Sequence, residues 1–259
     1  MITLDGIGPV DVTYTDQGEG HPVLLLHGGG GPLTVQGFAT LLSTRENARV
    51  ITPTHPGFAG TPRPEALTTV ADLATLYVTL LDTLDLTDVT VVGNSIGGWI
   101  ATEMTLLNSP RISSVIIVDA VGIDVPDHPV ADFFTLTMAE VAQLSYHDPE
   151  KYGIDPTKLP PAAQQAMASN RTALATYTAT GMTDPILTTR LATSTPPPTL
   201  VVWGEADQIA TPAYGKTYAN TIPGAEFHLL TNTGHLPQIE TPEDLLTTIW
   251  PFATKHATR

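Results

Sequence analysis

The chain has 259 residues, a length that α/β proteins reach as one large domain. Hydrophobic residues make up 42% of it and charged residues 14%, which excludes an intrinsically disordered chain. The net charge of −15, with only 11 lysines and arginines, argues against a nucleic-acid partner, and the lack of cysteine excludes disulfides and a thiolate nucleophile.

Apolar runs rich in Val, Ile and Leu recur along the chain, mostly without polar alternation, as in strands covered on both faces. We expect strands at Val10–Tyr14, Pro22–Leu26, Arg49–Thr52, Val89–Val92, Ser114–Val118, Leu200–Trp203 and Glu226–Leu230. Helical patterns alternate with these runs. One covers Thr68–Leu84, one follows Ser95, and one begins at Thr241, whose side chain can cap it. The alternation predicts an α/β fold with a mainly parallel, doubly wound sheet.

The pattern changes between Gly122 and Thr195, where we expect no strand. Helices are predicted at Phe133–Leu144 and Ala162–Thr180, and several prolines interrupt the segment. The run from Thr195 to Pro198 then forms a stiff linker back to the sheet. We therefore expect a core domain built from residues 1–121 and 196–259, with residues 122–195 as an insertion.

The most informative segment is a predicted strand that runs through Gly-Asn-Ser-Ile-Gly into a helix, with Ser95 at its centre. A nucleophile elbow needs this context, because glycines at Gly93 and Gly97 let a strained turn expose the serine hydroxyl. The alternative is a tight packing turn or a phosphate loop, but no lysine follows as in a phosphate-binding loop. Residues elsewhere in the chain are needed to distinguish these interpretations.

A serine hydroxyl needs a base within reach, and the base needs an acid that fixes its tautomer. Asp207 follows the predicted strand that ends at Trp203, and His235 follows the next strand. The order Ser, Asp, His along the chain is the order found in α/β folds that carry a serine nucleophile elbow. The other seven histidines lie in the glycine loop, in a turn, in the insertion, at element ends or inside a strand. We therefore predict Ser95, Asp207 and His235 as the catalytic residues.

Two other acidic residues compete for the acid role. Asp119 also ends an apolar strand, and its carboxylate could approach the same histidine. Asp207 is favoured because its loop carries a Gly-Glu-x-Asp turn and opens towards a helix start at Thr211. Asp207 could otherwise be an ordinary turn residue, and Glu205 fits a turn or supporting role.

An oxyanion formed at Ser95 needs two backbone N–H donors. Ile96 supplies the first. The second should come from the glycine run after His27, where we choose Gly29, because missing side chains let the backbone approach a substrate. The alternative for this run is a merely flexible loop.

Together these residues resemble the α/β-hydrolase superfamily over nearly the whole chain outside the insertion. The matching motifs are H-G-G-G at His27–Gly30, G-N-S-I-G-G at Gly93–Gly98, W-G-E-x-D at Trp203–Asp207 and G-H-L-P-Q-I-E-T-P at Gly234–Pro242. The segment Thr54–Thr61 is similar to a D-x-P-G-x-G-x-S segment of that family, with several departures. The resemblance implies that residues 122–195 form a helical cap over the site.

The resemblance implies a serine hydrolase for a small, largely apolar ester, without metal or cofactor. A second possibility is a carbon–carbon bond hydrolase of ring-cleavage products, although those enzymes usually carry Trp after the histidine, where this chain has Leu236. A third is a ligand receptor on the same fold. We expect a small-molecule substrate, no nucleic-acid or membrane partner, a monomer or homodimer, and a cytoplasmic location, since residues 1–20 lack a basic start followed by an apolar run.

Overall fold

A computed structural model describes residues 1–178 and 181–257. Its centre is a seven-stranded sheet in the order β11-β10-β7-β6-β4-β5-β3, in which only β3 is antiparallel to its neighbour. The strands are β3 (Tyr14–Gln17), β4 (His21–Leu26), β5 (Ala48–Pro53), β6 (Val89–Asn94), β7 (Ile112–Val118), β10 (Thr199–Gly204) and β11 (Glu226–Leu230). The predicted mainly parallel sheet is confirmed.

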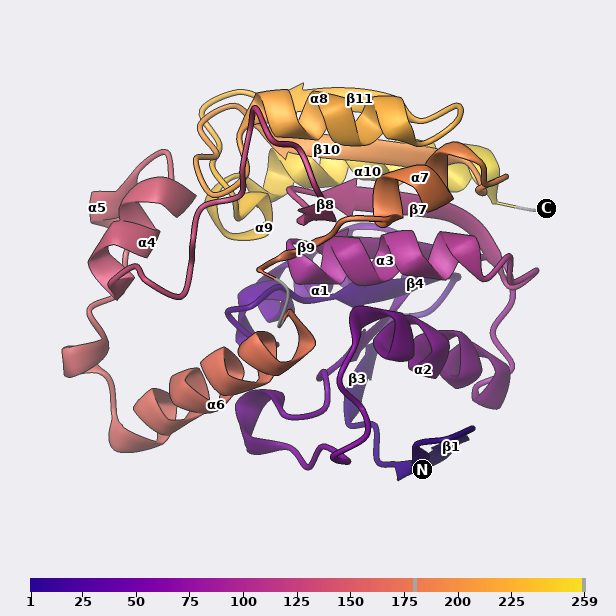
Figure 1. Cartoon of the computed structure of the whole chain (residues 1–259). Coiled ribbons are helices and arrows are strands. Elements are labelled where there is room, and N and C mark those ends of the chain that lie inside the picture. The colour runs from indigo at the N-terminus through magenta and orange to yellow at the C-terminus, as the bar shows by residue number, and fades with distance from the viewer. Residues whose placement is uncertain (179–180, 258–259) are drawn as a thin grey trace.

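Helices cover both faces of the sheet (Figure 1). They are α1 (Leu33–Arg45), α2 (Val70–Thr83), α3 (Ile96–Leu106), α8 (Pro212–Thr221), α9 (Pro237–Glu240) and α10 (Pro242–His256), with a 3₁₀ turn at Phe58–Gly60. Strand β4 shows how the faces divide. Leu24 and Leu26 pack in the cluster with α2 and α3, whereas Val23 and Leu25 pack in the cluster with α1 and α10.

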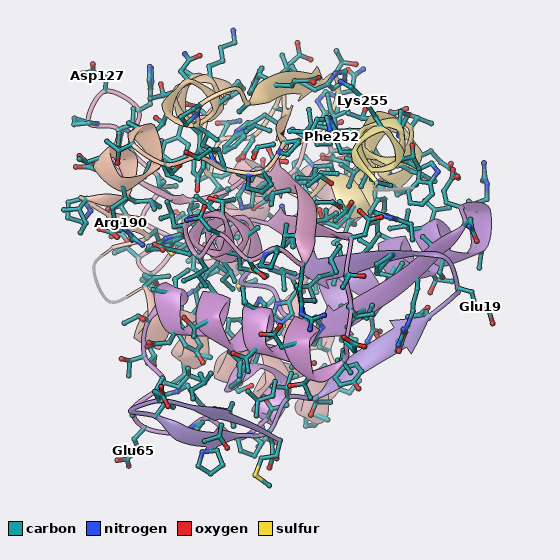
Figure 2. The ribbon with its side chains drawn as sticks, turned by 90° about the vertical axis from the view of Figure 1, so that its right-hand side faces the viewer. Glu19, Glu65, Asp127, Arg190, Phe252 and Lys255 are labelled. Atoms are coloured by element: carbon teal, nitrogen blue, oxygen red, sulfur yellow. The ribbon has the colours of Figure 1, made fainter. Side chains whose placement is uncertain are left out.

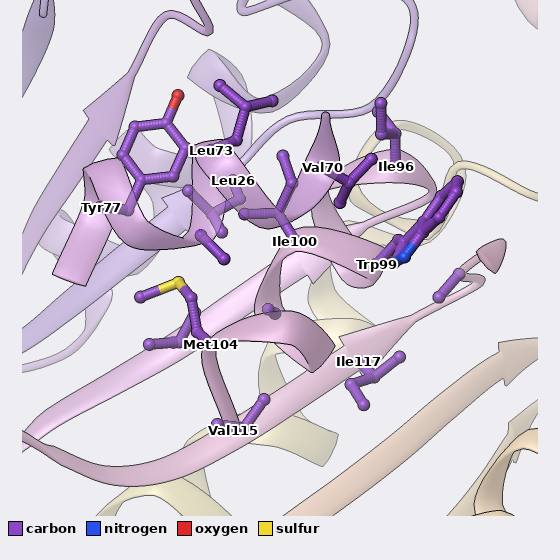
Figure 3. Close-up of a cluster of buried hydrophobic side chains, with 14 of the residues drawn as sticks. Leu26, Val70, Leu73, Tyr77, Ile96, Trp99, Ile100, Met104, Val115 and Ile117 are labelled. Carbon is purple, nitrogen blue, oxygen red and sulfur yellow. The ribbon is translucent and has the colours of Figure 1, made fainter. Parts of the chain in front are cut away.

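The larger apolar cluster lies under the helix that carries the predicted nucleophile elbow. Figure 3 shows Trp99, Ile100 and Met104 of α3 among side chains of α2 and of the strands. Because these residues are buried, α3 is held rigidly against the sheet. Charged side chains such as Glu19, Glu65 and Asp127 point outward instead (Figure 2).

The described residues between β7 and β10 add no strand to the large sheet. This segment contains β8 (Gly122–Ile123), α4 (Met138–Ser145), α5 (Pro149–Tyr152), a 3₁₀ turn at Pro156–Lys158, α6 (Pro161–Tyr177), β9 (Thr183–Asp184) and α7 (Leu187–Ala192). In Figure 1, α4, α5 and α6 stand to one side of the sheet. Among the described residues, no helix is long and apolar enough to cross a membrane.

Several local expectations were wrong. The run predicted as one strand, Val10–Tyr14, instead joins β2 (Gly8–Val10), which pairs with β1 (Ile2–Leu4), to β3. Two-residue strands β8 and β9 pair in a segment where we expected none. The helix predicted over Phe133–Leu144 begins only at Met138, because Thr137 and Glu140 form a capping box there.

Two predicted helices agree with the structure only in part. Helix α10 does begin at Pro242, but Thr241 does not cap it, since its hydroxyl is hydrogen-bonded to that of Thr233 at 2.9 Å. Helix α6 agrees with the predicted Ala162–Thr180 as far as Tyr177, and residues 179–180 lie outside the described residues.

Candidate active site

Ser95 lies at a sharp turn between β6 and α3. Its φ of 57° and ψ of −121° are unusual for a residue with a side chain. Its N–H donates to the Val118 carbonyl at 3.0 Å, and its carbonyl accepts the Trp99 N–H at 3.1 Å. The two flanking glycines make the turn possible. A Cβ on Gly93 would lie 2.1 Å from the Gly97 carbonyl oxygen, and one on Gly97 would lie 2.3 Å from the Leu26 carbonyl oxygen.

Asp207 and His235 form a buried pair at the ends of β10 and β11. His235 Nδ1 lies 2.8 Å from Asp207 Oδ2. The other oxygen, Asp207 Oδ1, accepts the N–H groups of Ile209 at 2.8 Å and Ala210 at 3.1 Å. A carboxylate so held accepts a hydrogen bond from the Nδ1–H group, and this tautomer leaves a lone pair on Nε2 of the histidine.

Two amides that the sequence analysis missed join the histidine loop to the elbow. Asn94, directly before Ser95, donates from Nδ2 to the His235 carbonyl at 2.9 Å. Gln238 donates from Nε2 to Asn94 Oδ1 at 3.0 Å. These bonds bring the loops that carry Ser95 and His235 together. Asn94 stands inside the elbow motif, but only the tertiary structure reveals its partners.

The glycine loop lies directly beside Ser95. A Cβ on Gly28 would be 3.1 Å from Ser95 Cβ, a tight contact that shows how closely the loop approaches the serine. The Gly28 carbonyl accepts hydrogen bonds from His27 Nδ1 at 2.8 Å and from the Gly31 N–H at 3.0 Å. Within the described part of the chain, the Gly29 N–H has no hydrogen-bond acceptor. Ile96 begins α3, so its N–H likewise has no helical carbonyl to bond.

Two buried histidines support this loop. His27 Nε2 accepts the N–H of His55 at 3.1 Å, and His55 Nε2 donates to the His27 carbonyl at 2.9 Å. His55 Nδ1 lies 2.5 Å from the hydroxyl of Tyr77. Burial lowers the pKa of His27 to about 4 and holds the pKa of His55 well below its usual value. Both rings are therefore neutral and fully hydrogen-bonded near pH 7.

Asp119, the rival acid, lies near the pair but faces another partner. Its Oδ1 accepts the Gly204 N–H at 2.8 Å. Burial, with the neighbouring Asp207 carboxylate as a smaller cause, raises the pKa of Asp119 well above its usual value. Ligand atoms of Asp119, Asp207 and His235 lie within 4.8 Å of one another, close enough to share a metal ion. His235 and Asp207 are already in direct contact with each other, at 2.8 Å.

A cavity of about 400 Å³ opens between the glycine loop and the segment 122–195. The loop contributes Gly29 and Gly30 to its wall, and Ser95 is not part of the lining. Most of the remaining wall is apolar, and Arg171 is the charged group in it. The wall residues outside the loop are Phe133, Leu136, Thr137, Met138, Pro156, Met167, Ala168, Asn170 and Arg171. Such a wall suits an apolar ligand with one anionic group.

The end of α4 contacts the loops that carry the acid and the base. The Ser145 carbonyl accepts the His235 N–H at 2.6 Å, and the Leu144 carbonyl accepts the Gln208 N–H at 2.9 Å. Glu240 links the same regions, since its two oxygens accept the N–H groups of Asp148 at 2.8 Å and Gly234 at 2.7 Å. The segment 122–195 therefore contacts the backbone beside two of the three predicted catalytic residues.

Known proteins show the same architecture. A family model described as "Alpha/beta hydrolase family" matches residues 23–248. The chain is 28% identical to 2-hydroxymuconate semialdehyde hydrolase of Pseudomonas putida, over 88% of this chain and 85% of that protein. It is also 28% identical to Lipase 3 of a Moraxella strain, over 88% of this chain and 76% of the lipase. The structure of a thermophilic esterase from Thermogutta terrifontis superposes with a TM-score of 0.78 at 26% identity, covering 99% of this chain and 98% of the esterase.

Proposed function

Since the chain belongs to the alpha/beta hydrolase family, we propose that it is a serine hydrolase that cleaves a small, largely apolar carboxylic ester through an acyl-enzyme on Ser95. The observation that carries this proposal is the buried 2.8 Å contact of His235 with Asp207, on loops bonded to the strained turn of Ser95. A nucleophile, a base and an orienting acid are the parts that acyl transfer needs.

The proposed reaction has two halves. Ser95 Oγ attacks the ester carbonyl carbon while His235 Nε2 takes the hydroxyl proton, and the charged oxygen accepts the N–H groups of Gly29 and Ile96. His235 then gives the proton to the leaving alcohol as the C–O bond breaks. In the second half, water loses a proton to His235 and attacks the acyl group. The acid leaves, and Ser95 regains its proton.

We assign substrate selection to residues 122–195, acting as a cap on a core made of residues 1–121 and 196–259. The cap supplies most of the apolar wall of the cavity, including Phe133, Leu136 and Met167. Its closeness to the glycine loop supports this role, because a closed apolar cap excludes water from the acyl-enzyme. Short acyl chains fit a cavity of about 400 Å³.

Hydrolysis of p-nitrophenyl butyrate tests the proposal. We expect Ser95→Ala to lower kcat by at least about 10⁴-fold, because the covalent step is lost. Ser113→Ala is a matched control, since within residues 1–178 and 181–257 its half-buried hydroxyl on β7 is bonded to the Val89 carbonyl alone, at 3.4 Å. Equal activity of Ser95→Ala and the wild type would refute the acyl-enzyme.

Arg171 favours a second candidate function, the cleavage of a carbon–carbon bond in an acidic ring-cleavage product. Its guanidinium lies 5.3 Å from the Phe133 ring centre and donates from Nη2 to the Phe134 carbonyl at 2.6 Å. Donors therefore remain for a carboxylate. One relative of this chain, 25% identical, is named a hexa-2,4-dienoic acid hydrolase.

Two substrates separate the candidates, p-nitrophenyl butyrate and a 2-hydroxy-6-oxohexa-2,4-dienoate. If the acidic substrate is the better one, Arg171→Met should raise its KM by about tenfold or more, since a charge-assisted hydrogen bond is lost. The KM of the neutral ester should stay the same. A dienoate that is not cleaved, or an equal change for both substrates, would exclude the second candidate.

A further inference from the structure

Helix α6 crosses the glycine loop, so the cap contacts the proposed oxyanion hole itself. A Cβ on Gly29 would lie 2.8 Å from Leu174 Cδ2, which shows how closely the helix approaches. One turn earlier, Asn170 is 7% exposed and uses both ends of its amide. Its Nδ2 donates to the Gly30 carbonyl at 2.9 Å, and its Oδ1 accepts the Ala59 N–H at 2.7 Å.

The hydrogen bond from Asn170 to the Gly30 carbonyl also affects the orientation of the proposed oxyanion donor, the Gly29 N–H, through two peptide groups. Asn170 fixes the Gly30 carbonyl, and the Gly31 N–H of the same planar trans peptide points the opposite way. That N–H donates to the Gly28 carbonyl at 3.0 Å. The Gly28 carbonyl shares its own peptide group with the Gly29 N–H. Each peptide plane therefore sets the direction of the next.

The loop is shaped to receive this side chain. Gly31 has a φ of +90°, and a Cβ on it would lie 2.4 Å from Asn170 Nδ2. Any other residue would both strain the backbone and displace the amide. The Thr34 hydroxyl, 2.7 Å from the Gly31 carbonyl, holds the following peptide group. Glycine is thus required where the cap amide and the loop meet.

We propose that Asn170 is a positioning residue of the oxyanion hole, and that the cap aims the Gly29 N–H at the substrate through the Gly30–Gly31 and Gly28–Gly29 peptide groups. This inference rests on the proposed serine mechanism. It means that the oxyanion hole is complete only when α6 is seated on the loop, so cap closure and transition-state stabilisation are one event.

Asn170→Asp separates this role from simple anchoring of the cap. The variant keeps the shape of the side chain and the acceptor for the Ala59 N–H, but loses the donor to Gly30. We expect kcat/KM for p-nitrophenyl butyrate to fall about tenfold to a hundredfold, somewhat less than the loss of a whole oxyanion donor. Affinity for butylboronic acid, whose tetrahedral adduct places an oxygen in the hole, should fall by a similar factor. Asn170→Ala should lose at least as much.

Ser169→Ala is the control on the same helix, because the Ser169 hydroxyl accepts the Gly60 N–H at 3.0 Å and donates to the Ala166 carbonyl at 2.9 Å, both outside the glycine loop. It should keep wild-type activity, and thermal unfolding should show that all the variants are folded. Wild-type kcat/KM and boronate affinity in Asn170→Asp, or an equal loss in Ser169→Ala, would overturn the inference while Ser95→Ala stays inactive. An active Ser95→Ala would instead overturn the proposed function, and this inference with it.

Discussion

Two buried carboxyl groups lie near His235, and their hydrogen-bond partners differ. Asp207 accepts two backbone N–H groups with Oδ1, and its Oδ2 lies 2.8 Å from His235 Nδ1. Asp119 accepts one N–H, and burial raises its pKa well above the usual range. The neutral form of Asp119 is therefore favoured, and Asp207 is the carboxyl group in contact with the histidine.

This difference predicts a large loss of activity for one Asp→Asn substitution and a small one for the other. Asp207→Asn should lower kcat for the ester by about 10³-fold to 10⁴-fold, because the amide favours the wrong histidine tautomer. Asp119→Asn should change kcat by less than about tenfold, since an amide resembles a neutral carboxylic acid and still accepts the Gly204 N–H. Steady-state kinetics of both variants provide the measurement. A larger loss in Asp119→Asn would assign the acid role to Asp119.

The site residues that follow strand ends could be predicted from the sequence, whereas those that connect distant parts of the fold could not. Asp207 and His235 could be chosen because both follow apolar runs in the right order, and the structure brings them into contact. The amide side chains of Asn94, Gln238 and Asn170 have no sequence pattern that indicates their partners. The hydrogen bonds that join them to His235, to Asn94 and to Gly30 each span more than 100 residues along the chain, so only tertiary structure reveals them.

At the scale of elements, the elbow depends on glycines that permit close backbone approach. Gly97→Ala would place a Cβ 2.3 Å from the Leu26 carbonyl oxygen, where no flexible side chain can yield. We expect it to lower the free energy of unfolding by about 3 kcal/mol, a cost typical of overpacking, and to reduce activity. Urea unfolding provides the measurement.

Gly37 in α1 offers the matched control. A Cβ there would have no atom within 4 Å, and the residue lies exposed within a helix. Gly37→Ala should therefore stabilise the protein by about 0.5–1 kcal/mol, since alanine loses less backbone freedom on folding. Similar losses at both positions would contradict the packing argument.

The predicted strands agree with the structure where the apolar run is continuous, and they fail where the chain changes direction. Val10–Tyr14 has the composition of a strand, yet its middle connects two strands that belong to different sheets. Helix α1 was not predicted, although Val35, Phe38, Ala39 and Leu42 are its buried residues and have helical spacing. This spacing could have predicted α1, but the run of glycines directly before it is typical of a loop.

At the scale of the whole molecule, the buried histidines link stability to pH. The pKa of His27 is about 4 in the folded state, below the value near 6.5 expected for the unfolded chain. Between these values the unfolded state binds a proton that the folded state does not. The free energy of unfolding should therefore fall as the pH falls, by about 1.4 kcal/mol per pH unit from this residue.

His27→Asn tests this contribution, because His55, Asp119 and the surface carboxylates are present in both proteins. Asparagine keeps a donor for the Gly28 carbonyl but cannot take up a proton in the unfolded state. Unfolding free energies from pH 4.5 to 6.5 should depend less steeply on pH in the variant, by about 1.4 kcal/mol per unit. Equal slopes would mean that His27 is not held neutral.

The two edges of the large sheet bear on how copies of this chain behave at high concentration. Strand β3 has four mostly exposed residues, and Arg49 on the next strand binds Asp16 through two hydrogen bonds of 2.7 and 3.0 Å. The opposite edge, β11, begins with an exposed glutamate, Glu226. Short edges bearing charge are poor templates for a foreign strand. With a net charge of −15 opposing close approach, fibrillar aggregation by edge-to-edge pairing is disfavoured.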